Sequence, residues 1–242
     1  MALWRPIIAF AFHLLYNPLA WAYDGVSWAV SRGEWRRWQR AVLPYLEGQR
    51  VLEIGFGTGD LLVDMAARGY QPWGIDLSPT MVSIAARKLQ AHGAIAHLCR
   101  ARAQALPFHD GAFDSIAITF PAGFIGEAET LREIGRVLRP QGQVVIADGG
   151  HLLGRDPLSR FLNWALGVAG GPAEPPTHVE QGEFLIERET VRFERSTVQV
   201  IVAQKRSFER FLPSWYNYRI LPPSQDDPIR GSSCSADDVG RC

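Results

Sequence analysis

A chain of 242 residues is long enough for one sizeable α/β domain with a cap or a tail, so we expect one catalytic core. Its 25 basic and 25 acidic residues cancel, which gives no reason to expect a long-range attraction to nucleic acid or anionic lipid. The three cysteines lack metal-binding or paired spacing, and this indicates a reducing compartment, with the cytoplasm as the default.

The first apolar stretch, residues 6–23, carries no charged side chain and allows four interpretations. A signal peptide would use Ala-Trp-Ala at 20–22 as its cleavage site, although a core that binds a cytosolic cosubstrate follows. A membrane span would be marginal in length and interrupted by His13, Asn17 and Pro18. The third interpretation is a helix at a bilayer surface, with peripheral membrane contact through residues 1–30. We prefer the fourth, a pair of amphipathic helices that covers the core as a lid.

The composition divides the chain into three parts. Residues 1–45 are rich in tryptophan and predict a helical cap with breaks at Pro18, Gly25 and Gly33. Residues 46–206 predict the catalytic core. Residues 207–242 lose periodicity and predict a flexible tail.

Strands and helices alternate through the first part of the core. A buried strand at 50–54 leads through a glycine turn into a helix at 60–68. The alternation continues with strands at 72–76, 95–100, 113–119 and 143–147, and with helices at 79–90 and 127–138, the last ended before Pro140-Gln141-Gly142. Such a series predicts a parallel, doubly wound sheet of the Rossmann-like α/β class.

The pattern changes after residue 148. A helix is expected at 158–168 and a loop at 170–176. Two long strands, 184–194 and 197–204, are separated by a short turn and predict an antiparallel hairpin at the end of the sheet.

Glycines 55, 57 and 59 let the chain turn sharply and let a ligand approach the backbone at a helix N-terminus. Their spacing is shorter than the dinucleotide fingerprint, and Asp60 occupies the position of its last glycine, where a carboxylate would repel a pyrophosphate. S-adenosylmethionine (SAM) has no phosphate. Asp76 ends the second strand, where a carboxylate can accept from both ribose hydroxyls. The joint spacing therefore favours SAM as the cofactor.

Four motifs extend this pattern along the chain. They are Val51-Leu52-Glu53-Ile54-Gly55-Phe56-Gly57-Thr58-Gly59, Gly74-Ile75-Asp76-Leu77-Ser78-Pro79-Thr80-Met81, Ala105-Leu106-Pro107-Phe108 with Phe113-Asp114, and Arg136-Val137-Leu138-Arg139-Pro140. In order and spacing they resemble the class I SAM-dependent methyltransferases over residues 48–205, in particular the small-molecule enzymes that act on quinones or lipids. The resemblance implies seven strands, the last antiparallel.

The resemblance also implies a set of SAM-binding residues. The methionyl end would be lined by Glu53, Gly55, Phe56, Gly57 and Gly59, and the ribose would be held by Asp76. The adenine would lie between Leu77 and Met81, with Ala103 and Gln104 at its edge. The methyl group would face Thr119 and Phe120, and Tyr23 would close over the cofactor from the lid. Arg102 departs from the family, because many relatives have an acidic residue there to accept from the adenine amino group.

The acceptor is expected to be a small molecule, and the tryptophan-rich front end favours a lipophilic one such as a quinone or a lipid. No metal site and no nucleic-acid contact is expected. Methyl transfer needs no dedicated base, so the catalytic residue is left open; His151 or Asp148 would serve only a hydroxyl acceptor, and a solvated loop histidine is the preferred interpretation of His151. The alternatives are a membrane-surface protein that keeps the fold without turnover, and a nicotinamide-dependent reductase.

Overall fold

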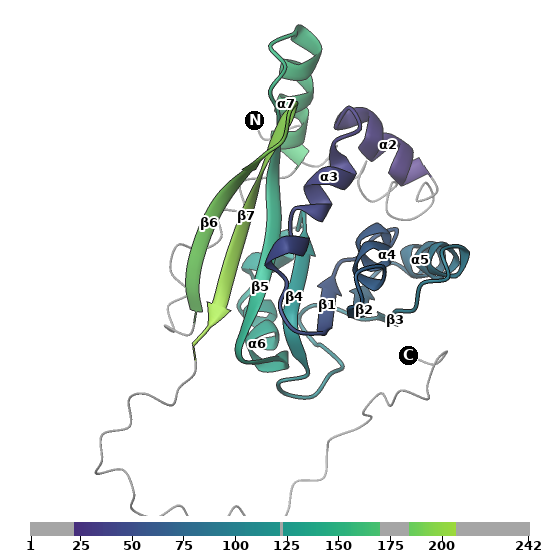
Figure 1. Ribbon diagram of the computed structural model, residues 1–242, viewed down its shortest axis with the longest axis vertical. Coiled ribbons are helices and arrows are strands. Elements are labelled where there is room, and N and C mark those ends of the chain that lie inside the picture. Colours follow the sequence, from purple (N-terminus) through teal and green to yellow (C-terminus); the bar gives the residue numbers. More distant parts are fainter. Residues whose placement is uncertain (1–21, 122, 170–183, 207–242) are drawn as a thin grey trace, which may run out of the picture.

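A seven-stranded sheet runs through the part of the chain that the computed structural model describes, residues 22–121, 123–169 and 184–206 (Figure 1). Its strand order is β3-β2-β1-β4-β5-β7-β6. The strands are β1 (Arg50–Ile54), β2 (Gln71–Asp76), β3 (His97–Arg100), β4 (Phe113–Thr119), β5 (Leu138–Leu152), β6 (Phe184–Arg192) and β7 (Ser196–Lys205).

The pairing of these strands confirms the predicted fold class. β1 pairs in parallel with both β2 and β4, so the chain winds in opposite directions on the two sides of β1. β7 is antiparallel to β5 and to β6, which gives the expected hairpin at the end of the sheet. The crevice between the carboxyl ends of β1 and β4 is the point where such sheets bind ligands.

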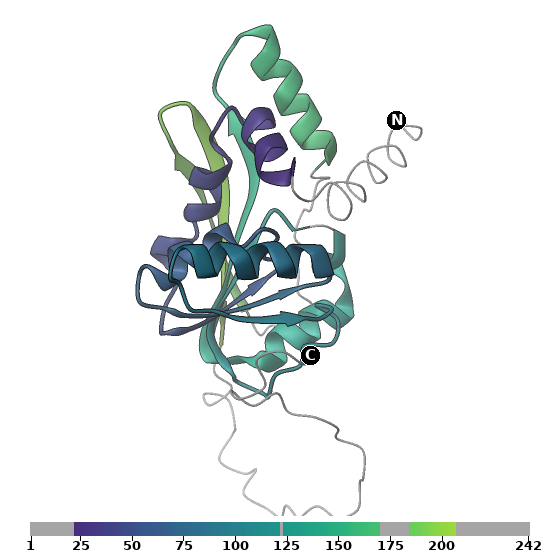
Figure 2. The same ribbon diagram turned by 90° about the vertical axis from the view of Figure 1, so that its right-hand side faces the viewer.

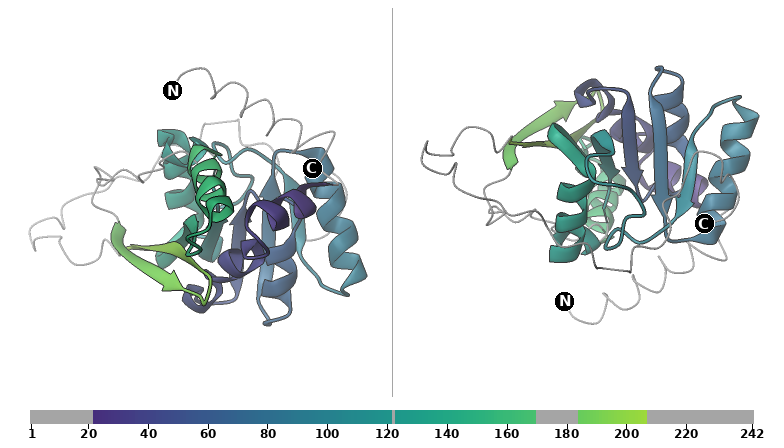
Figure 3. Two further views of the ribbon diagram at one scale, coloured as in Figure 1. Left: turned by 90° about the horizontal axis from the view of Figure 1, so that it is seen from above. Right: turned by 90° about the horizontal axis from the view of Figure 1, so that it is seen from below.

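Helices cover both faces of the sheet, as views from two further directions show (Figures 2 and 3). On one face, α4 (Asp60–Ala66) and α5 (Pro79–Ala91) bury Leu61, Leu62, Met65, Ala85 and Leu89. On the other face, α6 (Ala128–Val137) buries Ile134 and Val137 against the opposite side of the same strands. The residues of β1 alternate between the two cores, with Val51 on the α4 face and Leu52 on the α6 face.

The fifth strand differs from its prediction at both ends. β5 begins at Leu138, directly after α6, and continues through Pro140-Gln141-Gly142, whereas the sequence predicts a strand only from residue 143. It also runs on to Leu152, because its pairing with β7 continues to Asp148 and resumes at His151 and Leu152 after a register shift. A pairing partner far along the chain extends the strand beyond its apolar run.

The cap consists of α2 (Tyr23–Val30), α3 (Trp35–Arg40) and the 3-10 helix η2 (Leu43–Tyr45). The predicted break at Gly25 is wrong, because α2 runs through this residue; the first helix ends near Ser31 instead. Trp38 anchors the cap, since its side chain is fully buried and its indole Nε1 donates to the hydroxyl of Ser196 on β7 at 2.9 Å. A side chain at Gly150 would collide with this indole, so the end of β5 fits under it.

Several predictions lie outside the described residues: the apolar stretch before residue 22, the loop at 170–176 and the tail from 207. The helix expected at 158–168 is α7 (Pro157–Ala169). Within the described ranges, no helix is long and apolar enough to cross a membrane.

Candidate functional site

The glycine loop joins β1 to α4 at the carboxyl edge of the sheet. Gly55, Gly57 and Gly59 have φ angles of 77°, 55° and 82°, a region that other residues enter only with strain. Gly59 forms the N-cap of α4, where a Cβ would lie only 2.7 Å from the Cβ of Ala85 on α5. At Gly57 an added Cβ would meet nothing within 4 Å, so the backbone there is open to a ligand.

Asp76 braces this loop from the end of β2. Its carboxylate accepts from the amide of Gly57 at 2.9 Å and from the amide of Ser78 at 2.8 Å. Burial raises the pKa of Asp76, and the backbone hydrogen bonds offset only part of that rise. A carboxylate has lone pairs beyond these two bonds and can also accept from ligand hydroxyls.

Glu53 is the least satisfied polar group of the site. Its side chain is buried, and neither carboxylate oxygen has a hydrogen-bond partner among the residues that the structure describes. Burial raises the pKa of Glu53 well above its usual value, and the negative charges of Asp76, Asp60 and Asp64 raise it further. A buried carboxyl without a partner is costly, and a ligand ammonium group would satisfy it.

The residues expected around the adenine surround the end of β2. Leu77 is exposed, whereas the side chain of Met81 is fully buried under the first turn of α5. Ala103 is buried, and the side-chain amide of Gln104 donates to the carboxylate of Glu127 at 2.6 Å. Arg102 is exposed, and its backbone carbonyl accepts from the amide of Ala105.

An aromatic cluster lies where β4 ends, next to Thr119. Phe120 has a φ of 50°, a strained conformation for a bulky residue, and its amide donates to the carbonyl of Ala147 on β5 at 2.8 Å. Its ring stacks on Trp35 of the cap, with ring centroids 4.2 Å apart. Tyr23 meets Trp35 edge-on at 6.5 Å. The structure therefore brings the predicted residues Tyr23 and Phe120 together around Trp35, which the sequence did not single out.

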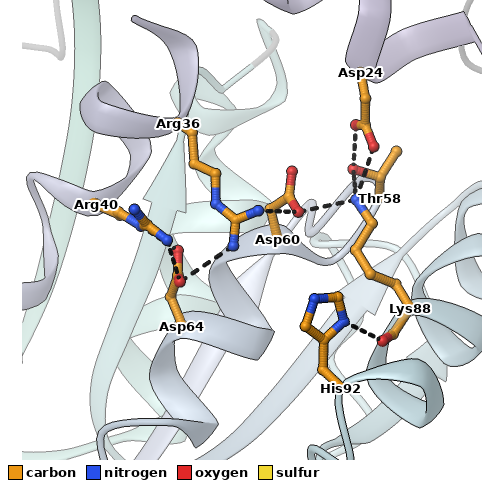
Figure 4. A network of polar contacts seen from close by, with 8 residues as sticks. All are labelled: Asp24, Arg36, Arg40, Thr58, Asp60, Asp64, Lys88 and His92. Atoms are coloured by element: carbon orange, nitrogen blue, oxygen red, sulfur yellow. Dashed lines mark hydrogen bonds and ion pairs between the residues drawn. The ribbon is translucent and has the colours of Figure 1, made fainter. Parts of the chain in front are cut away.

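A polar network ties the cap to the glycine loop (Figure 4). The ammonium of Lys88 on α5 lies 2.8 Å from Asp24 of α2, 2.9 Å from Asp60 and 3.0 Å from the hydroxyl of Thr58. Thr58 in turn donates to Asp24 at 2.7 Å. Arg36 of α3 reaches Asp60 at 3.1 Å, so the network links two cap helices to the loop.

This network compensates the charge of Asp60, which the sequence analysis used to exclude a dinucleotide. Asp60 was expected to repel a pyrophosphate, but its carboxylate is paired with both Lys88 and Arg36, so its charge is largely compensated. The short glycine spacing remains as the argument against a dinucleotide. The structure also buries the side chain of Phe56 beneath the loop, against Gly74 and Leu62, so only its backbone faces the site.

The two residues considered as bases lie near the end of β5. Asp148 follows Ala147 directly, and burial raises its pKa, although the amide of Gly149 donates to its carboxylate. His151 is exposed and lies 3.3 Å from the side-chain amide of Asn163 on α7. Among the described residues, no cluster of three or more histidine, cysteine or acidic side chains could hold a metal ion.

Sequence reasoning missed Trp35, Arg36 and Lys88. Nothing in the local pattern distinguishes them from the other tryptophans of the cap or from the neighbouring Arg87 on α5. Only the packing of the cap on α4 and α5 reveals their partners.

The part of the chain that carries the glycine loop is similar to known proteins. The family model described as a methyltransferase domain matches residues 51–142. The demethylmenaquinone methyltransferase of Thermus thermophilus is 38% identical over 55% of this chain and 64% of its own length. The ubiquinone/menaquinone biosynthesis C-methyltransferase of Geotalea uraniireducens is 32% identical over 55% of this chain and 61% of its own length. The matched part thus spans less than two thirds of either relative.

The fold is shared with a Methanococcus maripaludis protein of known structure, which is described as a SAM-dependent methyltransferase. The two superpose with a TM-score of 0.55 at 18% identity, over 79% of this chain and 94% of the other. The geometry of the site is compatible with SAM: the carboxyl of Glu53, buried without a partner among the described residues, and the open backbone at Gly57 suit the amino and carboxylate groups of its methionyl end. As the resemblance read from the sequence implies, residues 51–142 match a methyltransferase domain, and the chain has the predicted Rossmann-like fold.

Proposed function

We propose that the chain transfers the methyl group of SAM to a small lipophilic acceptor with a quinone-like ring. The observation that carries this proposal is the buried, unpartnered carboxyl of Glu53 beside a glycine loop that Asp76 holds in place. The names of the two relatives above, a demethylmenaquinone and a ubiquinone/menaquinone methyltransferase, support the acceptor class.

Different residues of the chain would bind different groups of the cofactor. Glu53 would accept from the amino group, and the open backbone around Gly57 would receive the carboxylate. Asp76 would accept from the ribose hydroxyls with lone pairs that its backbone bonds leave free. The exposed Leu77 would cover the adenine from outside, while Met81, Ala103 and Gln104 would form the base and edge of its site.

The aromatic cluster at the end of β4 would receive the acceptor. Phe120 and Trp35 present stacked rings beside the glycine loop, and Tyr23 adds an edge. Planar rings pack on such a cluster in offset-stacked or edge-to-face geometry, which favours a quinone-like acceptor over a flexible one. Thr119 and Phe120 would then lie on the path between the acceptor and the methyl group.

Methyl transfer mainly requires that the protein hold the acceptor and the methyl group in the right position and orientation. When bound, SAM would supply an electrophilic methyl group on a cationic sulfur, and the chain would hold the acceptor atom in line with it. The cap would exclude water from the site, and the glycine loop would fix the orientation of the cofactor. An acceptor carbon or hydroxyl also loses a proton. Asp148 directly follows Ala147, whose carbonyl accepts from the amide of Phe120, and burial raises the pKa of this aspartate, so we favour it over the exposed His151 as the base.

Incubation with methyl-labelled SAM tests the proposal directly. The purified chain would be mixed with detergent-solubilised demethylated quinols and, in parallel, with phospholipids and small polar phenols. Label transferred to the quinols supports the proposal. If the chain binds S-adenosylhomocysteine but transfers label to no acceptor, the protein keeps the fold without turnover; if label reaches only the polar phenols, the acceptor class is wrong.

A further inference from the structure

Large apolar side chains are exposed at one end of the molecule. Of the nine large hydrophobic side chains that are exposed among the described residues, six lie on or next to α2 and α7. We call this set the apical surface; it consists of Val26, Trp28, Leu153, Leu158, Phe161 and Trp164. Its aromatic members are more than half exposed. Contiguous exposed apolar groups on a water-soluble domain mark a contact surface.

The two elements that carry the apical surface are tied to each other. Arg32, just after α2, donates to Asp156 at 3.1 Å and to the hydroxyl of Ser159 at 2.7 Å, so the end of α2 is held against the start of α7. The side view shows the two helices toward the same end of the molecule (Figure 1). On α7 the rings of Phe161 and Trp164 lie 5.8 Å apart. The apolar side chains therefore form neighbouring parts of one surface.

Helix α7 turns an apolar face outward. Ser159 and Leu162 are buried against the domain, whereas Leu158, Phe161 and Trp164 point away from it with exposed fractions of 55 to 58%. A surface helix of a soluble protein normally presents polar groups on its outer face. Tryptophan and phenylalanine on one face, with arginine beside them, are typical of helices that lie in a membrane interface.

The charges around the apical surface favour an anionic partner. The segments 22–40 and 153–169 hold six arginines, of which four, Arg32, Arg36, Arg37 and Arg40, form ion pairs with acidic side chains. The positive charge next to the apical surface therefore comes from the other two. Arg155 and Arg160 are exposed next to the apolar face of α7, and α7 itself contains no acidic residue. Arginines near a bilayer are attracted to anionic headgroups, each by about 1 kcal/mol.

We propose that the apical surface docks on an anionic lipid bilayer, with Leu158, Phe161 and Trp164 of α7 inserted at the headgroup level. α7 follows the carboxyl end of β5, and α2 contacts Thr58 of the glycine loop, so docking brings the candidate site close to the bilayer. A lipophilic acceptor then reaches the site without crossing water. The docking itself needs no methyl transfer, and it can succeed or fail independently of the proposed activity.

Vesicle co-sedimentation of the full chain tests this proposal. Wild type is expected to bind vesicles of mixed phosphatidylglycerol and phosphatidylcholine, and to bind phosphatidylcholine alone more weakly. The triple variant L158S/F161S/W164S should bind at least about tenfold more weakly, because three large apolar groups no longer leave water. The matched control is I95S/L185S, which changes exposed apolar side chains elsewhere and should bind like wild type.

Three outcomes would overturn the proposal. The first is the absence of vesicle binding by wild type, and the second is equal binding by the triple variant and the control. The third is a concentration-dependent dimer that the triple variant abolishes without any change in vesicle binding, which would assign the apical surface to a second copy. Stabilisation by S-adenosylhomocysteine verifies that each variant is folded. If the triple variant does not fold, Trp164→Ser alone replaces it in the vesicle experiment. R155Q/R160Q should reduce binding to anionic vesicles only.

Discussion

Lys88 and Asp24 form an ion pair of 2.8 Å that joins the core helix α5 to the first helix of the cap. The same ammonium contacts Asp60 and Thr58, so one cation holds together a cap helix, the glycine loop and the start of α4. Lys88 is mostly shielded from solvent, which makes this contact stronger than an exposed ion pair of the same length. The cap and the cofactor loop are therefore mechanically linked.

Lys88→Met should loosen the cap while leaving the core folded. The variant removes three hydrogen-bonded contacts, and we expect a loss of about 1 kcal/mol in the free energy of unfolding. Hydrogen exchange of the amides in α2 should become faster, and S-adenosylhomocysteine should slow it again if the ligand orders the loop. Arg87→Met is the control, because Arg87 is exposed and its Nε donates to the carbonyl of Ser83 within the same helix. Unchanged exchange in α2 would show that Lys88 does not hold the cap.

The sheet was predictable because periodicity and glycine position are local signals. The parallel strands around the glycine loop repeat short apolar runs between helices, and their bounds agree within a few residues. The misjudged C-terminal end of β5 depends on β7, which is more than 40 residues away and supplies pairing partners to a polar stretch. The early start of β5 at Leu138 depends on pairing with Phe113 of β4. Gly25 failed as a break because one glycine weakens a helix by about 1 kcal/mol, and packing of the cap can outweigh that.

The residues proposed to bind the cofactor could also be predicted from local sequence patterns, since Glu53, the glycines and Asp76 belong to two adjacent strand ends. The residues proposed to receive the acceptor could not. The stack of Trp35 on Phe120 joins residues 85 positions apart, and no periodicity encodes it. The compensation of Asp60 by Lys88 and Arg36 likewise needs the packed helices, which is why charge repulsion was a poor argument from sequence alone.

Asp76→Asn should weaken the binding of S-adenosylhomocysteine by about tenfold to a hundredfold, since a hydrogen bond to a charged group contributes about 1.5–3 kcal/mol. An asparagine turns one acceptor into a donor, which would then face the amide of Gly57 or Ser78. Titration calorimetry measures the loss. Asp114→Asn is a matched control: Asp114 accepts from the amides of Gln49 and Arg50 at the opposite end of β1, so its variant should lower stability without changing affinity. Equal losses of affinity in both variants would refute a role for Asp76 in holding the ligand.

Gly59→Ala should destabilise the protein more than Gly69→Ala, although both glycines have nearly the same φ of 82° and 83°. Each substitution costs about 1–2 kcal/mol of backbone strain. At Gly59 the new methyl would also meet Ala85 at 2.7 Å, and such overpacking costs about 1–3 kcal/mol more, whereas nothing lies within 4 Å at Gly69. Urea unfolding compares the two variants. Equal destabilisation would mean that α4 and α5 can separate at the glycine loop without cost.

Glu53→Gln should change how stability depends on pH. Burial raises the pKa of Glu53 in the folded protein well above 4.5, so the folded state keeps a proton that the unfolded state has released. Between 4.5 and the folded pKa the unfolded state binds fewer protons, and stability therefore falls as pH rises. The variant lacks this group, so it should match wild type at the acid end and be more stable near neutral pH.

Ligand binding should reverse the order of stability of wild type and Glu53→Gln near neutral pH. An ammonium group next to Glu53 favours its charged form, so S-adenosylhomocysteine should stabilise wild type increasingly as pH rises through this window. The neutral glutamine cannot form that ion pair, and we expect weaker binding to Glu53→Gln at neutral pH. Thermal unfolding of both proteins from about pH 4 to 8, with and without ligand, makes the comparison. Parallel curves without ligand would mean that Glu53 titrates normally, and equal ligand shifts would mean that the amino group of the cofactor binds elsewhere.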